Sequence, residues 1–489
     1  MIRIGIFDLE PYFKTRLGRL YCGDALGVLK KLPSECVDVV ITSPPYWAKR
    51  DYGEATCKVW GGDPNCDHEW TDEIIVRQRG VAGVGNTGNQ SKIIPGQDTH
   101  QVRGKFCKKC GAWYGQLGLE PTPHMFVDHL VEIFREVKRV LKPTGSLFVV
   151  IDDTWSGSGF SPRGNDNLYS GRQGHIWSGL FQNEAPRKSL TLVPELFAIK
   201  MVYEEGWILR EKIIWAKKVH FYKKRTTYGN AMPESVKDRF CHTWEYIYHF
   251  TKKPKYYFDL DPVRVPLKTE IMSRTQRGIE SQKLNGTTKG IMVEKLKKYY
   301  NEILQSNGVC PLGANPGDVI QTNVKPFKDA HFAVFPLEIP EMLIKVACPR
   351  YVCPKCGKPF KVIKEYTETT ERIDFKYYGA TESGEYHGKP LKDYKKTMAE
   401  DPSEVKKRIL QSMKKAIKSV RYEPDCRCGL EGVSGVVLDP FAGAGTTLIV
   451  AEKLGMRWIG IEINPEYCEI IKKRFEKELG GLIYSNRLF

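Results

Sequence analysis

Residues 436–447 read Val-Val-Leu-Asp-Pro-Phe-Ala-Gly-Ala-Gly-Thr-Thr, and this stretch is the most informative part of the chain about its architecture. Its apolar start predicts a buried strand, its glycines predict a tight turn, and the pattern of residues 448–454 predicts a helix. In such a strand-turn-helix unit, the glycines let a ligand approach the backbone closely. A second apolar strand, residues 458–461, ends in Glu462. An acidic residue at this place is suited to accept hydrogen bonds from ribose hydroxyls.

The composition of the turn distinguishes between two classes of nucleotide ligand. A dinucleotide-binding fingerprint has a third glycine, which allows tight packing around a pyrophosphate. Here Leu448 occupies that place, while Thr446 and Thr447 offer hydroxyl groups. The turn therefore favours a nucleoside ligand without a pyrophosphate over the cofactor of a dehydrogenase.

A second motif, Thr-Ser-Pro-Pro-Tyr-Trp at residues 42–47, follows the apolar run 37–41. Prolines stop strand pairing, so the backbone carbonyls around them lack strand partners. The Ser43 hydroxyl and the Pro44 carbonyl can then accept hydrogen bonds from one amino group, and Tyr46 offers a flat face to a planar ring. This combination suits chemistry on the exocyclic amine of a nucleobase. Taken alone, the motif would also fit a proline-rich turn after a buried strand.

Together the two motifs resemble those of the amino-directed DNA methyltransferases that use S-adenosylmethionine. The catalytic motif of that family corresponds to Ser43, Pro44, Pro45 and Tyr46, and its cofactor motif corresponds to residues 439–447. Catalytic motif first and cofactor motif last resembles the circularly permuted, β-type order. Serine at the first catalytic position typifies the cytosine-N4 enzymes of the family, whereas adenine-N6 enzymes usually carry Asp or Asn there.

The resemblance also implies which residues bind the cofactor. Asp24 would face the adenine amine, Glu462 the ribose, and Asp439 the methionine ammonium group. Phe335 belongs to a segment, residues 331–336, that resembles the element closing over the methionine end of the cofactor. The full implied set is Asp24, Phe335, Asp439, Phe441, Gly443, Gly445, Thr446, Thr447 and Glu462.

The implied reaction is direct methyl transfer to cytosine N4 in double-stranded DNA, on a base rotated out of the helix. No Pro-Cys dipeptide, the nucleophile motif of cytosine-C5 enzymes, is present. The resemblance further implies a role in restriction-modification, with a cognate restriction endonuclease as partner. Three alternatives stay open: adenine-N6 methylation on the same fold, a zinc-bearing DNA-binding protein without activity, and methylation of RNA or protein.

Composition supports a nucleic-acid partner. The net charge of +17 and the pI near 9.1 favour binding to a polyanion, with strong salt dependence. No apolar run approaches the roughly 18 residues of a membrane span, and the N-terminus carries no secretory signature. We therefore expect no membrane contact and a cytoplasmic location, associated with the nucleoid.

Eight of the 14 cysteines form two sets of four, each joining two residues at one end of a long insert to two at the other. Four thiolates are a ligand set that structural zinc sites use, and without a secretion signal disulfides are the weaker interpretation. In the first set His68 could replace Cys66, and loop thiols without metal remain the alternative for both. The expected ligands are Cys57, Cys66, Cys107 and Cys110, then Cys353, Cys356, Cys426 and Cys428.

Strand and helix patterns alternate along much of the chain, as in an α/β sheet with helices on both faces. We expect a circularly permuted Rossmann-like methyltransferase sheet with polar, zinc-bearing insertions, built from both ends of the chain. The expected catalytic domain comprises residues 1–48, 116–260, 326–352 (with the cofactor-closing element) and 431–489; the inserts are 49–115 and 353–430, and the target-recognition region is 261–325.

Overall fold

The protein is represented by a computed structural model. The residues it describes are 9–49, 52–72, 74–79, 99–156, 185–186, 188–231, 234, 236–265, 315–323, 335–366 and 417–483. They belong to two compact units: residues 1–259, 317–359 and 426–489 form the first, and residues 260–316 and 360–425 form the second. Most of the expected target-recognition region, 261–325, lies outside the described residues.

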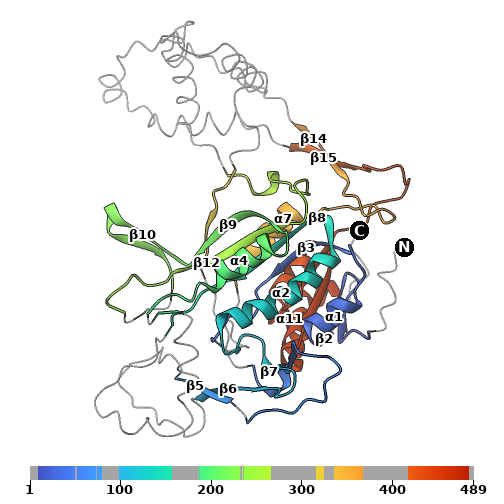
Figure 1. The fold of residues 1–489 in the computed structure, drawn as a ribbon. Helices are drawn as coiled ribbons and strands as arrows, with labels where there is room; N and C mark the ends of the chain where they lie inside the picture. Colours follow the sequence, from blue (N-terminus) through green and yellow to red (C-terminus); the bar gives the residue numbers. More distant parts are fainter. Residues whose placement is uncertain are drawn as a thin grey trace, which may run out of the picture. The chain divides into compact units, whose positions relative to one another are not determined.

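A nine-stranded mixed sheet forms the centre of the first unit (Figure 1). Its order is β1-β2-β17-β16-β3-β8-β12-β9-β13. The five strands from β2 to β8 run parallel, and β12 runs against both of its neighbours. The strands are β1 (Phe13–Lys14), β2 (Gly18–Cys22), β17 (Arg457–Glu462), β16 (Val436–Asp439), β3 (Val37–Thr42), β8 (Leu141–Ile151), β12 (Trp244–Thr251), β9 (Ile208–Ala216) and β13 (Val319–Gln321).

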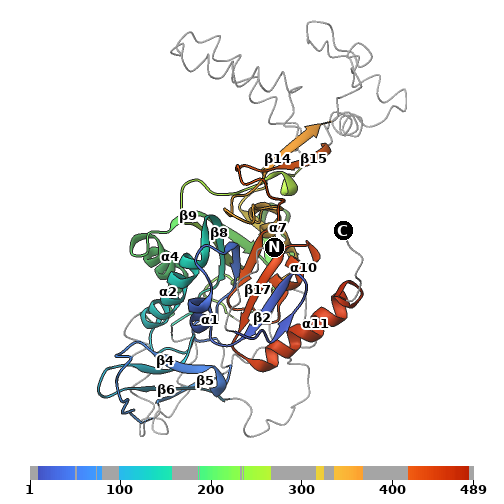
Figure 2. The same ribbon diagram turned by 90° about the vertical axis from the view of Figure 1, so that its right-hand side faces the viewer.

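Helices cover both faces of this sheet, which confirms the expected α/β architecture. Helices α1 (Ala25–Lys31), α2 (Pro123–Val140) and α4 (Val193–Tyr203) lie on one face, and α10 (Thr446–Lys453) and α11 (Pro465–Ile483) lie on the other (Figure 2). A further helix, α7 (Glu338–Ala347), packs against α10. Because both faces are covered, every residue of β3 and β16 is buried, which explains their nearly unbroken apolar sequences.

In the middle of the sheet, two strands from the C-terminal end of the chain lie between strands from its N-terminal end. β16 lies between β17 and β3, and its register places Val437 beside Val39 and Leu438 beside Val40. β17 in turn pairs with β2. The N-terminal and C-terminal segments therefore share one sheet, as the sequence analysis expects.

The insert after β3 forms a separate four-stranded antiparallel sheet in the order β4-β7-β6-β5. Trp60 and Trp113, a cross-strand pair in this sheet, are buried and stack on His129 of α2. The insert therefore packs directly on the helix layer. Its elements are η1 (Glu54–Thr56), β4 (Cys57–Trp60), β5 (Ile74–Arg79), β6 (Thr99–Phe106) and β7 (Trp113–Gln116).

A two-stranded hairpin, β10 (Lys218–Phe221) and β11 (Thr226–Gly229), follows β9, with a short 3-10 turn η3 (Tyr222–Lys224) at its tip. In the second unit, β14 (Lys361–Tyr366) and β15 (Ile417–Glu423) form an antiparallel pair, and Lys364 forms a 2.5 Å ion pair with Asp261 at the start of η4 (Asp261–Val263). Within the described segments, no helix has both the length and the apolar character needed to span a membrane.

Candidate active site

The two sequence motifs meet at the carboxyl ends of adjacent parallel strands. Thr42, the last residue of β3, donates a 2.6 Å hydrogen bond from its hydroxyl to the Asp439 carboxylate at the end of β16. The Thr447 hydroxyl, in the first turn of α10, donates to the carbonyl of Ile41 on β3 at 3.4 Å. In open α/β sheets, ligands bind at such strand ends. The proline motif and the glycine turn thus border one edge of the sheet.

The glycine turn depends on two residues with left-handed backbone. Gly445 caps α10 with φ +76°, and a Cβ added to it would lie 2.9 Å from the Ile471 side chain. Gly443 has φ +53°, and an added Cβ would meet nothing closer than the Phe441 carbonyl oxygen at 4.0 Å. Gly445 is therefore held by packing against α11, whereas space remains beside Gly443.

Two buried carboxylates face this turn. Glu462, at the end of β17, accepts hydrogen bonds from the backbone amides of Gly443 at 2.8 Å and Asn464 at 2.9 Å. Burial raises the pKa of Glu462 to about 7 and that of Asp439 to about 6. No cation among the described residues forms an ion pair with either carboxylate. Both acids can therefore change charge near neutral pH.

Asp24 lies at the same edge, just after β2, where the Gly23 amide donates to the carbonyl of Glu462 at 2.8 Å. Its carboxylate already has two partners. Oδ2 accepts from the Gly27 amide at 2.8 Å as the N-cap of α1, and Oδ1 pairs with Lys58 Nζ at 2.7 Å. A ligand at this edge would meet a carboxylate whose orientation is fixed by the helix and by the insert.

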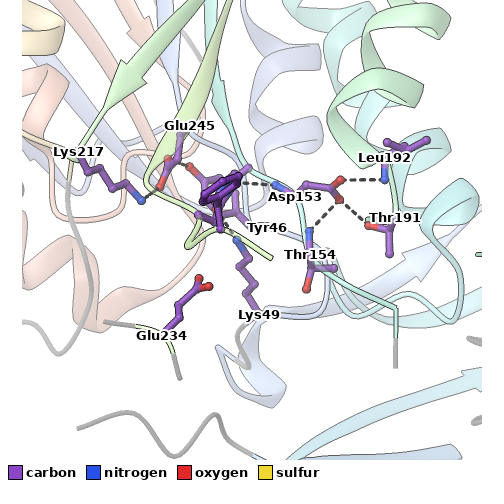
Figure 3. Close-up of polar contacts among 12 residues, drawn as sticks. Tyr46, Lys49, Asp153, Thr154, Thr191, Leu192, Lys217, Glu234 and Glu245 are labelled. Atoms are coloured by element: carbon purple, nitrogen blue, oxygen red, sulfur yellow. Dashed lines mark hydrogen bonds and ion pairs between the residues drawn. The ribbon is translucent and has the colours of Figure 1, made fainter. Parts of the chain in front are cut away.

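The proline motif is held by a network that Figure 3 shows from Tyr46 outward. The Tyr46 hydroxyl donates a 2.5 Å hydrogen bond to the Glu245 carboxylate and accepts one from Ser43 Oγ at 3.3 Å. Glu245, near the start of β12, also forms an ion pair with Lys217, just after β9. Burial and the Glu245 charge raise the pKa of Tyr46 well above its usual range, so Tyr46 is a neutral donor.

Sequence reasoning did not assign roles to Glu245 and Lys217. Neither residue belongs to the proline motif or the glycine turn, and no local motif marks an ion pair between them. The sequence signal that could have found them is an acid and a lysine at the ends of two apolar runs, 213–215 and 246–250. Only the antiparallel pairing of β9 with β12 shows that these ends meet.

A second cluster of charges lies beside Tyr46. The Asp152 carboxylate accepts from Lys49 Nζ at 2.6 Å and pairs with His242 at 2.7 Å. Burial opposes ionisation of Asp152, but the His242 hydrogen bond and the Lys49 charge outweigh it and lower its pKa to about 2. The neighbouring Asp153 has a structural role (Figure 3). Its carboxylate accepts hydrogen bonds from the Thr154 and Leu192 amides and the Thr191 hydroxyl.

The segment after β7 supports the proline motif. The Ala48 amide donates to the carbonyl of Gly118 at 2.8 Å, and the Trp47 indole donates to the carbonyl of Glu120 at 3.0 Å. Gly118 has φ +94°, and an added Cβ would lie 3.2 Å from the Pro45 Cβ. The segment after β7 therefore fits closely against the loop that carries Ser43.

Two groups of metal-ligating side chains lie in the first unit. In each group the four ligand atoms lie within 4.8 Å of one another: Cys66, His68, Cys107 and Cys110 form the first, and Cys353, Cys356, Cys426 and Cys428 the second. In the first group, Cys66 Sγ and Cys107 Sγ are 3.9 Å apart. Tetrahedral zinc with its usual bonds to sulfur needs about 3.8 Å, so the donor set fits this ion.

The structure corrects one expected ligand. Cys57 was expected in the first group, but His68 takes its place. Cys66, to which His68 was the alternative, stays in the group. The reason is the register of β4. Cys57 pairs with Gln116, whereas Trp60 pairs with Trp113, the end of β7 nearest Cys110. Three residues of strand separate Cys57 from that end, about 10 Å.

The last expected cofactor residue, Phe335, is half-buried ahead of α7. The residues before it, 331–334, lie outside the described residues. Phe441 is half-buried in the glycine turn and packs against the hydrophobic core.

Comparison with known proteins assigns the family. A family model described as a DNA methylase, covering N6- and N4-directed enzymes, matches residues 37–350 and 364–473. The chain belongs to this DNA methylase family. The matched residues of this DNA methylase include the proline motif, the glycine turn and Glu462.

Individual relatives resemble the DNA methylase over most of its length. The type II methyltransferase M.SfiI of Streptomyces fimbriatus is 26% identical, covering 92% of this chain and 88% of the relative. M.Cfr9I of Citrobacter freundii is 25% identical, covering 94% and 88%. The solved PvuII DNA methyltransferase (cytosine-N4-specific) aligns at 16% identity over 99% of this chain and 92% of that one, with a TM-score of 0.41. That structural similarity is too low to assign a target base.

Proposed function

We propose that this DNA methylase transfers a methyl group from S-adenosylmethionine to cytosine N4 in double-stranded DNA, with its motifs in the circularly permuted, β-type order. One observation carries the proposal. Ser43 and Gly443 follow neighbouring parallel strands, and Thr42 and Asp439 are hydrogen-bonded between them. A methyl donor held by the turn would face an amine held by the proline motif.

The cofactor edge fits S-adenosylmethionine. Glu462 is a buried carboxylate without a cationic partner among the described residues, a suitable acceptor for two ribose hydroxyls. The open space beside Gly443 admits a ligand close to the backbone. S-adenosylmethionine would supply the methyl group as a sulfonium substituent. We assign Asp24 to the adenine amine, Asp439 to the ammonium group, and Phe335, Phe441, Gly445, Thr446 and Thr447 to the walls of this site.

On the base side, Ser43 Oγ and the Pro44 carbonyl would accept the two hydrogens of the amine. These hydrogen bonds favour a more tetrahedral nitrogen and direct its lone pair, an effect of preorganised dipoles on developing charge. Pro45 fixes the turn, and Tyr46 offers its ring to the rotated base. Because the Tyr46 hydroxyl is held by Glu245, the ring is oriented before the base arrives.

Serine at position 43 supports cytosine over adenine because it typifies the cytosine-N4 enzymes of the family. Chemistry alone does not separate the two bases, because either amine could be held in the same way. The test is to express the protein in a host lacking other DNA methylation, digest its DNA to nucleosides and determine their masses. N4-methylcytosine is the expected product, and N6-methyladenine would show that the adenine alternative is right. DNA binding without any methylated nucleoside would support the alternative without enzymatic activity.

The type II names of the relatives support a role in restriction-modification, with a cognate restriction endonuclease as partner and the cytoplasm, at the nucleoid, as location. We further propose that both metal-ligating groups bind structural zinc. Residues 261–325 would form the target-recognition region, and 49–115 and 353–430 the zinc-bearing inserts. The catalytic domain would comprise the four segments named in the sequence analysis.

A further inference from the structure

The hairpin β10–β11 exposes a set of large aromatic side chains. All residues from His220 to Tyr228 are exposed. The exposed fraction is 85% for Tyr222 at the tip, 61% for Tyr228 and 48% for Phe221. Isolated two-stranded hairpins gain little stability by themselves. Exposed aromatic residues concentrated on one such element therefore indicate a binding surface.

The register of the hairpin sorts these side chains onto two faces. Val219 pairs with Tyr228 and Phe221 pairs with Thr226, so these four residues share one face, which carries the aromatic rings of Phe221 and Tyr228. Lys218 and His220 lie on the other face. The hairpin is thus a narrow ribbon with a flat aromatic side, and a two-stranded ribbon has dimensions that a DNA groove admits.

The hairpin is basic and contains no acid. Lys218, Lys223, Lys224 and Arg225 lie in it, and no Asp or Glu occurs between residues 218 and 233. Within the described part of the chain, no carboxylate forms an ion pair with the three cations of the tip. The acids that follow are already paired, Glu234 with Arg239 and Asp238 with Lys188. The tip therefore offers uncompensated positive charge.

The root of the hairpin adjoins the active site. Lys217, the residue before β10, holds Glu245, which in turn holds Tyr46. The amides of Lys217 and Lys218 both donate to the Thr243 carbonyl beside β12, at 2.8 and 3.3 Å. From this fixed root, four strand residues reach about 14 Å. Figure 1 shows β10 projecting beyond β9 and β12.

We propose that the β10–β11 hairpin binds duplex DNA beside the rotated base. Lys223, Lys224 and Arg225 contact backbone phosphates, and Tyr222 contacts the bases next to the vacated position. This inference rests on the proposed function, because it takes the DNA duplex as substrate. Charge complementarity selects this occupant: a strip of cations without acids matches a phosphate backbone, and an exposed tyrosine offers a ring on which bases stack.

The test compares three variants with the wild-type chain. The Lys223→Gln/Lys224→Gln variant removes tip charge, Tyr222→Ala removes the tip ring, and Lys30→Gln/Lys31→Gln removes two exposed lysines from the end of α1 as a matched control. Fluorescence anisotropy measures binding of a labelled mixed-sequence duplex across a salt series. Melting temperature and cofactor binding report whether each variant is folded.

The tip-charge variant should bind the duplex about tenfold more weakly, with a slope of log K against log salt shallower by about 1 to 2. Tyr222→Ala should keep the wild-type salt slope but lower the methylation rate about tenfold. The control should differ from wild type by less than twofold in affinity. Wild-type affinity and slope in the tip-charge variant would overturn the inference, as would tighter binding of the wild type to single-stranded RNA than to the duplex.

Failure of this inference can be told from failure of the proposed function. If the wild-type chain methylates DNA but the hairpin variants match it in every readout, only the hairpin assignment is wrong. If the wild-type chain transfers no methyl group to DNA, but the tip-charge variant binds the duplex more weakly than the wild type, the hairpin assignment stands and the proposed reaction is wrong.

Discussion

Glu245 fixes the hydroxyl of Tyr46, and the two residues should act as a unit in catalysis. Tyr46→Phe keeps the ring but removes its anchor, so we expect methylation to slow about tenfold while cofactor affinity stays unchanged. Glu245→Gln should have an effect of similar size. In the double variant the losses should not add, because the same contact is removed twice.

Single-turnover methylation of DNA by the four proteins measures this coupling. Glu211→Ala, on the neighbouring strand β9, is a matched control that removes an exposed carboxylate without touching Tyr46. Fully additive losses would show that Glu245 acts on the reaction without Tyr46.

Glu462 should make cofactor binding and stability depend on pH in opposite directions. Its pKa is raised from 4.5 to about 7 by burial. The free energy of unfolding of the unliganded protein should therefore fall as the pH rises from 4.5, the ordinary glutamate pKa, through about 7, because burying the ionised carboxylate is unfavourable. Cofactor affinity should rise over the same range, up to about tenfold per pH unit, because the carboxylate is the better hydroxyl acceptor.

Calorimetric titration of S-adenosylmethionine and thermal melts between about pH 5 and pH 8 measure both trends. In Glu462→Gln the cofactor should bind weakly and with little pH dependence. Asp439, with its pKa near 6, contributes at the lower end, so Asp439→Asn separates the two acids. Cofactor affinity that is flat in the wild type would contradict the assignment of Glu462 to the ribose.

At the scale of elements, the metal groups offer a test with an internal control. Cys107→Ser removes a ligand of the first group, whereas Cys57→Ser changes a cysteine of the same sheet that lies outside it. We expect two equivalents of zinc by elemental analysis of the wild type, one in Cys107→Ser and two in Cys57→Ser. Two equivalents in both variants would exclude the first group as a zinc site.

If the first group binds zinc as proposed, loss of the ion should also slow methylation. The segment after β7 holds the proline motif through the carbonyls of Gly118 and Glu120, and Lys58 of β4 holds Asp24. Cys107→Ser should therefore lower both the methylation rate and cofactor affinity, while Cys57→Ser keeps both within about twofold.

Local patterns in the sequence predicted the elements well and the contacts between them less well. The strand-turn-helix unit at 436–454 was predictable because its apolar run, glycines and helix pattern are contiguous. The pair of Glu245 with Tyr46 joins residues far apart in the chain, and no periodicity reports such a contact. Cys57 was wrongly expected as a ligand for a related reason, because only the β4–β7 register shows that it lies away from the group that His68 joins.

At the scale of the molecule, the chain should work when divided in two. Fragments 1–400 and 401–489 separate β16 and β17 from β2 and β3, between which they lie. Neither fragment alone should bind S-adenosylmethionine, and co-expression should restore methylation to within about tenfold of the intact chain. The second metal group spans the division, so Cys353→Ser in the first fragment should weaken the reconstitution. Cofactor binding by fragment 401–489 alone would refute a site built from both ends.

The placement of β16 and β17 between β2 and β3 has a consequence for synthesis on the ribosome. The early strands emerge long before the late ones, so the nascent chain carries two unpaired strand edges for most of translation. Unpaired strand edges promote association with other chains. Pairing between strands that lie so far apart in the sequence is also slow. A prematurely terminated chain also lacks the glycine turn and Glu462. Incomplete products should therefore be candidates for chaperones and proteases, and they should never compete with the finished enzyme for its methyl donor.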